Sequence, residues 1–92
     1  MYQPAEDSFL LSDLIKEYLT NRNKSIKVLD LGTGSGIQAE TCKSLGFDNI
    51  LAADIASESL DFASKKRIKT IKSNLFSKIK EKFDLIIYLK TK

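Results

Sequence analysis

The sequence predicts an α/β fold in which a parallel sheet of about four strands is flanked by helices. Two observations lead to this prediction. Apolar runs of strand length alternate with amphipathic stretches of helix length, and a glycine-rich loop joins the first strand-like run to the helix after it. The 92 residues suffice for one small domain, spanning residues 1–92.

The first helix is expected after Pro4, with Asp7 or Ser8 as its cap. Apolar residues then recur at steps of three and four, which predicts one apolar stripe packed on the rest of the fold; they are Leu10, Leu11, Leu14, Ile15, Tyr18 and Leu19.

The remaining elements follow in alternation. Strands are predicted over 26–31, 50–55, 68–73 and 83–88, and helices over 37–45 and 58–66. Gly46 should end the earlier of these helices, and Ser57 should cap the later one. Residues 78–82 are too few for a full helix between the last two strands. This alternation favours right-handed crossovers and a parallel sheet.

Composition narrows the class of protein. With 42% hydrophobic and 29% charged residues, the chain is expected to fold. No apolar run approaches the roughly 20 residues that span a bilayer, so no membrane association is expected. Cys42 is the single cysteine and there is no histidine, so neither an internal disulfide nor a multi-cysteine metal site is expected. We expect a cytoplasmic, reducing location and a buried, unreactive Cys42.

Charge is distributed unevenly along the chain. Residues 1–64 carry five basic and ten acidic side chains, whereas residues 65–92 carry ten basic and two acidic ones. The basic end could attract nucleic acid, but its lysines are dispersed, and a solvated lysine-rich surface is the favoured interpretation.

The most informative segment is 28–36, an apolar strand followed by Asp30, Gly32, Gly34 and Gly36. A carboxylate at the end of this strand would repel a pyrophosphate but attract a cationic ligand such as S-adenosylmethionine. The glycine spacing also departs from the dinucleotide-binding pattern.

A second acid, Asp54, ends the next strand, where an acidic side chain can accept hydrogen bonds from ribose hydroxyls. The two acids and the loop predict a site for S-adenosylmethionine. In the alternative, Asp30 and Asp54 only cap loops, and the glycines only form a tight turn.

These segments resemble class I S-adenosylmethionine-dependent methyltransferases. The opening 2–11, with 30–36, 54–55, 73–76 and 83–88, is similar to the HemK-like branch, which methylates a glutamine side chain of translation release factors. The resemblance implies a Rossmann-like class I methyltransferase fold, of which this chain would be the N-terminal part.

The resemblance also implies roles for individual residues. Ser8, Asp30, Gly32 and Gly34 would contact the methionine part of the cofactor, with Gly36 in the same loop. Asp54 would hold the ribose, and Asn74 with Leu75 would meet the adenine. The implied partners are a release-factor substrate and either a small zinc-binding activator subunit or a separate catalytic half.

Two of the departures from the resembled family bear on its function. Asn74 replaces its usual aspartate, although an amide oxygen can also accept a hydrogen bond. The family's Asn-Pro-Pro-Tyr motif is replaced by residues 89–92, Leu-Lys-Thr-Lys, so no catalytic residue is assigned. Two other functions are therefore considered: a non-catalytic interaction module, and a nucleic-acid methyltransferase of the adenine-N6 type.

Overall fold

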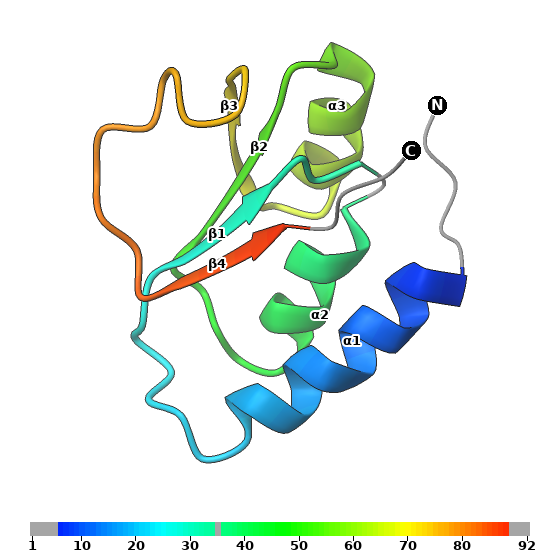
Figure 1. Cartoon of the computed structure of the whole chain (residues 1–92), viewed down its shortest axis with the longest axis vertical. Helices are drawn as coiled ribbons and strands as arrows, with labels where there is room; N and C mark the ends of the chain where they lie inside the picture. The colour runs from blue at the N-terminus through cyan, green and yellow to red at the C-terminus, as the bar shows by residue number, and fades with distance from the viewer. Residues whose placement is uncertain (1–5, 35, 89–92) are drawn as a thin grey trace.

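The computed structural model describes residues 6–34 and 36–88, with side chains from residue 10 onward (Figure 1). These residues form α1 (Glu6–Leu19), β1 (Val28–Leu31), α2 (Ile37–Ser44), β2 (Ile50–Asp54), α3 (Ser57–Lys65), β3 (Lys69–Lys72) and β4 (Leu85–Tyr88). The four strands lie within the predicted runs, and the Rossmann-like class predicted from the sequence is confirmed.

The strands form one parallel sheet in the order β3-β2-β1-β4, and Figure 1 shows β1 between β2 and β4. The last residue of β1, Leu31, pairs with Ala53 on one side and with Tyr88 on the other. Asp54 pairs with Lys72 at the end of β3. The carboxyl ends of all four strands therefore meet at one edge of the sheet.

Alternating side chains divide the sheet into two apolar faces. One cluster joins the strands to all three helices; its buried members include Ile15, Leu19, Val28, Ala39, Cys42, Ile50, Ala52, Ala63 and Ile87. A second cluster joins the opposite face to the connection between β3 and β4; it contains Leu29, Leu31, Leu51, Ala53, Ile71, Ile79 and Phe83. Helices thus cover one face, and a loop covers part of the other.

Chain direction explains this asymmetry. The steps from β1 to β2 and from β2 to β3 run the same way across the sheet, so right-handed crossovers place α2 and α3 on one face. The step from β3 to β4 runs back across the sheet, so residues 73–84 must cross the other face. As the sequence predicts, no helix forms within 78–82.

The predicted single stripe of α1 is wrong in one respect. Leu11, Ile15 and Leu19 pack on the core, but Leu10, Leu14 and Tyr18 form a second row that is exposed. On the other side of the buried row, Ser12 Oγ donates a hydrogen bond of 2.9 Å to Gln38 Oε1 of α2. The apolar surface of α1 is therefore wider than the surface that the described residues cover.

The predicted helix caps are also wrong. Asp7 and Ser8 lie within α1, and Ser57 is the first residue of α3. The position before α3 is Ala56, whose amide donates to Asp54 Oδ1 at 2.9 Å. The Asp54 carboxylate therefore binds the amide of the residue just before α3, where alanine offers no capping side chain.

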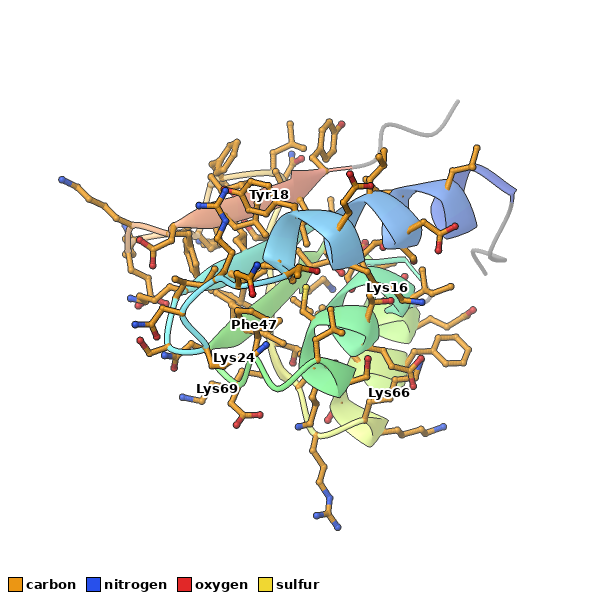
Figure 2. The ribbon with its side chains drawn as sticks, turned by 90° about the horizontal axis from the view of Figure 1, so that it is seen from below. Lys16, Tyr18, Lys24, Phe47, Lys66 and Lys69 are labelled. Atoms are coloured by element: carbon orange, nitrogen blue, oxygen red, sulfur yellow. The ribbon has the colours of Figure 1, made fainter. Side chains whose placement is uncertain are left out.

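The end of α2 is as predicted. Gly46 has a φ of +96°, the Phe47 amide donates to Cys42 O at 3.1 Å, and the Gly46 amide donates to Lys43 O at 3.0 Å. This left-handed ending turns Phe47 into the core, where Lys24 Nζ lies 4.4 Å from the centre of its ring (Figure 2).

Substituting Gly46 tests that ending. Gly46→Ala should lower the free energy of unfolding by about 1 kcal/mol, because an L-residue is strained at this φ. A Cβ would lie 3.7 Å from Lys24 Cδ, an ordinary contact, so the loss reflects the backbone alone. Gly46→Asn should lose less, since asparagine tolerates this conformation. Equal urea-denaturation midpoints for the glycine and alanine proteins would contradict the assignment.

Two further expectations concern reactivity and membranes. Cys42 is a buried free thiol, and burial raises its pKa to about 12, so it stays protonated and unreactive at neutral pH, as predicted. No helix within the described residues is both long and apolar enough to cross a bilayer. In the same residues, no group of three or more His, Cys, Asp or Glu side chains could hold a metal ion.

Candidate cofactor site

The predicted site residues with described side chains converge on the carboxyl edge of the sheet. The glycine loop follows β1, Asp54 ends β2, and Asn74 and Leu75 follow β3. Backbone hydrogen bonds connect the three segments. The amides of Gly32 and Thr33 both donate to Ala53 O, at 2.8 and 3.0 Å, and the Ser73 amide donates to Asp54 O at 3.0 Å.

The alternate glycines are needed for the backbone path. Gly32, Gly34 and Gly36 have φ values of +71°, +55° and +81°, which L-residues with a Cβ adopt only under strain. Crowding is not the reason at Gly36, where a Cβ would lie 3.7 Å from Ala63 Cα. The loop therefore follows a backbone path that glycine adopts readily and leads directly into α2, as a cofactor-binding turn does.

Asp30 lies deeper than the sequence suggests. Only 2% of its surface is exposed, and its Oδ2 accepts hydrogen bonds from Thr33 Oγ1 at 2.8 Å and from the Ala39 amide at 3.2 Å. Ala39 is the third residue of α2, so Asp30 acts as a remote cap for a helix preceded by glycine. The contacts described for this side chain are those of the loop-capping alternative.

Burial also changes the acidity of Asp30. Removal from water raises the pKa of its carboxyl to about 6, although the Thr33 and Ala39 hydrogen bonds act in the opposite direction; the nearby Asp54 charge raises it slightly further. A cation placed beside this carboxyl would lower the pKa again.

Asp54 is half-buried and faces the loop. Its Oδ2 accepts from the Gly34 amide at 3.0 Å, and its Oδ1 accepts from the Ala56 amide at 2.9 Å. Each carboxylate oxygen accepts about two hydrogen bonds, so each retains capacity for one more donor. Two adjacent ribose hydroxyls are donors of the required kind and spacing.

The segment after β3 is held in a compact turn. Ser73 Oγ donates to Leu75 O at 2.6 Å and accepts from the Lys78 amide at 3.1 Å. Leu75 has a φ of +54°, and the Asn74 and Leu75 side chains are both exposed. They lie at the predicted edge, and their contact with adenine stays a prediction. Ser8 lies in α1, but its side chain falls outside the described residues, as do residues 89–92.

Sequence reasoning missed the role of Thr33. Its buried hydroxyl donates to Asp30, so it fixes the orientation of the carboxylate beneath the loop. The spacing of Asp30 and Thr33 in the sequence could have revealed this role. A hydroxyl side chain three residues after an aspartate, on the far side of a glycine turn, can readily donate a hydrogen bond back to it.

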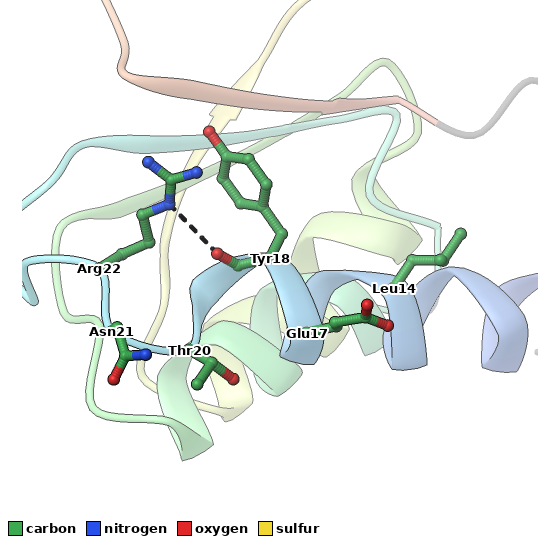
Figure 3. A pocket seen from close by; sticks show the side chains of 6 residues that line it. All are labelled: Leu14, Glu17, Tyr18, Thr20, Asn21 and Arg22. Atoms are coloured by element: carbon green, nitrogen blue, oxygen red, sulfur yellow. Dashed lines mark hydrogen bonds between the residues drawn. The ribbon is translucent and has the colours of Figure 1, made fainter.

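A separate shallow pocket lies at the end of α1, away from the candidate site (Figure 3). Its lining residues are Leu14, Glu17, Tyr18, Thr20, Asn21 and Arg22. Arg22 Nε donates to Tyr18 O at 3.2 Å, and the guanidinium stacks 4.3 Å from the centre of the Tyr18 ring. These residues precede β1 and contain none of the predicted cofactor contacts.

Comparison with known proteins identifies the class. Residues 5–91 match the family model described as a methyltransferase domain, and the chain belongs to this family. Methyltransferases of this kind use S-adenosylmethionine as the methyl donor, which agrees with the cofactor predicted from the sequence.

Three curated relatives show the range of likeness. The ribosomal protein L11 methyltransferase of Lactobacillus acidophilus is 39% identical over 71 residues, which cover 70% of this chain and 23% of that protein. A putative protein N5-glutamine methyltransferase of Methanocaldococcus jannaschii is 32% identical over 94 residues, 96% of this chain and 45% of that protein. The release factor glutamine methyltransferase of Agrobacterium fabrum is 33% identical, over 92% of this chain and 34% of its own length.

A solved structure agrees with the fold. The ribosomal protein L11 methylase from Lactobacillus delbrueckii subsp. bulgaricus superposes with a TM-score of 0.78 at 32% identity, over 91% of this chain and 46% of that one. The present chain thus spans less than half the length of each of these four relatives.

The residues present fit the cofactor chemically. Asp54 has spare acceptor capacity at the half-buried mouth of the loop. The glycine loop brings backbone to the start of α2, and Asp30 places a negative charge beneath it. S-adenosylmethionine carries ribose hydroxyls, an ammonium and a sulfonium, which are complementary to these groups.

Proposed function

We propose that this chain is the cofactor-binding part of an S-adenosylmethionine-dependent protein methyltransferase of the release-factor glutamine class. The observation that carries the proposal is the extent of the similarity. The sequence matches to these two glutamine methyltransferases cover 96% and 92% of the chain, whereas the sequence matches to the L11 methyltransferases of Lactobacillus acidophilus and Dictyoglomus turgidum cover 70% and 82%.

In this proposal the described residues bind and orient the cofactor. Asp54 holds the ribose, the glycine loop and Asp30 hold the methionine part, and Asn74 with Leu75 meets the adenine. Bound S-adenosylmethionine supplies an electrophilic methyl group, and the acceptor is a protein side chain. The groups that orient the methyl-accepting atom are assigned to polypeptide beyond the described residues, either a further segment or a partner. We infer a cytoplasmic location, in which the free thiol of Cys42 stays reduced.

Two observations support a different acceptor as the main competitor. Identity to the L11 methyltransferase reaches 39%, and the solved neighbour is an L11 methylase. A ribosomal protein is therefore the competing substrate.

A nucleic-acid acceptor has weaker support, because parts of the basic end are already engaged. Lys66 pairs with Glu40 at 3.2 Å, and Lys72 Nζ donates to Ser57 Oγ at 3.3 Å. A non-catalytic interaction module is the remaining alternative. It would keep the fold without requiring any acceptor chemistry.

Calorimetric titration of the purified chain tests the proposal. We expect S-adenosylmethionine to bind with micromolar affinity, about −8 kcal/mol, and NAD to show no heat of binding, because the Asp30 charge opposes a pyrophosphate and the glycine spacing departs from the dinucleotide-binding pattern. Failure of S-adenosylmethionine to bind would leave the interaction module as the better description.

A second experiment, which compares the binding of candidate acceptor proteins, identifies the acceptor. With the cofactor present, a purified bacterial release factor is expected to bind the chain more tightly than purified ribosomal protein L11. The reverse order would assign the chain to the L11 class. Salt-sensitive binding of RNA in preference to both proteins would favour the nucleic-acid alternative.

A further inference from the structure

Three described residues other than glycine have a positive φ. They are Asn21, Arg67 and Leu75, with φ values of +69°, +62° and +54°. Asn21 and Arg67 lie just beyond the ends of α1 and α3, where a left-handed residue commonly ends a helix. Leu75 instead follows the strand β3. Its left-handed conformation is therefore not explained as a helix ending.

The conformation of Leu75 is unfavourable for a leucine. At this φ the Cβ atom approaches a backbone carbonyl oxygen, so the residue is strained. The side chain gains little burial in return, since 53% of its surface is exposed. Strain of this kind persists only where surrounding groups hold it, and it is concentrated at ligand-binding positions. Two questions follow: which group holds Leu75, and which ligand uses it.

The group that holds Leu75 is the side chain of Ser73, which is buried. A hydroxyl can donate one hydrogen bond, and Ser73 Oγ donates its bond to Leu75 O at 2.6 Å. The same oxygen accepts a bond from the Lys78 amide at 3.1 Å, so it joins the two ends of the turn. The bond to Leu75 O fixes the peptide that follows Leu75, and it thereby fixes the backbone from which the leucine side chain projects.

Ser73 also ties this turn to the acid that ends β2. The Ser73 amide donates to Asp54 O at 3.0 Å, so Ser73 is bonded to β2 through its backbone and to Leu75 through its side chain. At the other end of the turn, Ile79 packs on the second apolar cluster of the sheet. One buried serine therefore links the position of Leu75 to the position of Asp54.

We propose, on the basis of the cofactor-binding function proposed above, that Ser73 is a positioning residue. Its hydroxyl holds Leu75 in the left-handed conformation and so presents the exposed leucine side chain to the adenine while Asp54 holds the ribose. Ser73 acts through Leu75 and not on the cofactor, because its side chain is buried and its single donor is already used. Such preorganisation lowers the cost of ordering the site when the cofactor binds.

Calorimetric titration of S-adenosylmethionine into the full chain tests the proposal through a double-mutant cycle. Ser73→Ala should weaken binding about five- to tenfold, because it removes the hydrogen bond to the Leu75 carbonyl. Leu75→Gly relieves the strain but removes the apolar side chain, and it should weaken binding by a similar factor. When Leu75→Gly is already present, adding Ser73→Ala should change the affinity less than about twofold, since no leucine side chain remains to be positioned.

Two further variants separate positioning from a general loss of stability. Ser44→Ala is the matched control, because Ser44 Oγ also donates to a backbone carbonyl, Thr41 O at 2.7 Å, but at the end of α2 that is remote from the glycine loop. It should leave the affinity unchanged. Ser73→Cys replaces the hydroxyl by a weakly donating thiol and should weaken binding in the same direction as Ser73→Ala. Far-UV circular dichroism checks that each variant is folded during the titration.

The outcomes distinguish this role from the function on which it rests. A wild-type chain that gives no heat with S-adenosylmethionine would overturn both. If the wild-type chain binds but Ser73→Ala weakens binding equally with and without the Leu75 side chain, only the positioning role is wrong. The positioning role is also wrong if both Ser73 variants bind as tightly as wild type, or if Ser44→Ala loses as much affinity as Ser73→Ala.

Discussion

Asp54→Ala is expected to weaken S-adenosylmethionine binding by at least about 100-fold. The substitution removes two carboxylate oxygens, each with capacity for one ribose hydroxyl, and hydrogen bonds to a charged acceptor contribute about 1.5 to 3 kcal/mol each. Calorimetry on the wild-type chain and the variant measures the loss. An unchanged affinity would show that Asp54 only holds the loop and that the ribose binds elsewhere.

The variant also loses two bonds within the fold, so it needs a control that separates binding from stability. Asp84 is a suitable match, because its Oδ2 accepts a hydrogen bond of 2.8 Å from the Lys27 amide at the opposite edge of the sheet. Asp84→Ala should lower stability by about 1 kcal/mol and leave cofactor affinity unchanged. Equal losses of affinity in both variants would trace the effect to general destabilisation.

Periodicity alone located most of the fold. All four strands lie inside predicted runs, because each is a short segment bounded by turn-forming or polar residues. The chain turns out of α2 at Gly46, as expected for a residue without a side chain. The apolar residues of α1 span a wide stripe, and the sequence did not reveal which row of that stripe is buried. Leu10 and Leu14 are as apolar as Leu11, and only the position of α2 and the sheet decides which of them is covered.

Local rules failed where the partner is distant in the chain. Asp30 caps α2 through the amide of Ala39, nine residues away along the chain. The location of the site at the carboxyl ends of the strands was predictable, because it follows from the parallel topology. The burial of Asp30 was not predictable, because it depends on how α2 and Thr33 pack against its carboxylate.

Asp30 should make the chain less stable as the pH rises through about 6. The carboxyl has a pKa near 3.9 when unfolded and about 6 when folded, so between these values the folded state binds more protons. The stabilisation from this extra bound proton is fully present below about pH 4 and is lost by about pH 7. The difference of about two pKa units corresponds to a loss of about 3 kcal/mol in the free energy of unfolding.

Asp30→Asn isolates this contribution. Both hydrogen bonds are accepted by Oδ2, so an asparagine oxygen in that place keeps them while removing the titration. Urea denaturation should therefore show the variant gaining about 3 kcal/mol relative to wild type between about pH 4 and pH 8. Asp61→Asn, at an exposed aspartate of α3, is the control for replacing an aspartate by asparagine as such. A difference between Asp30→Asn and wild type that is constant with pH would mean that the carboxyl is not desolvated in solution.

The same ionisation reveals whether Asp30 also contacts the cofactor. A cationic group of S-adenosylmethionine beside the carboxyl would lower its pKa, so binding near pH 6 would release a fraction of a proton. Calorimetry in two buffers of different ionisation enthalpy measures that release directly, and Asp30→Asn should abolish it. A wild-type chain that binds the cofactor without releasing protons at this pH would confine Asp30 to capping α2, and the charge that attracts the cofactor would have to be sought in Asp54.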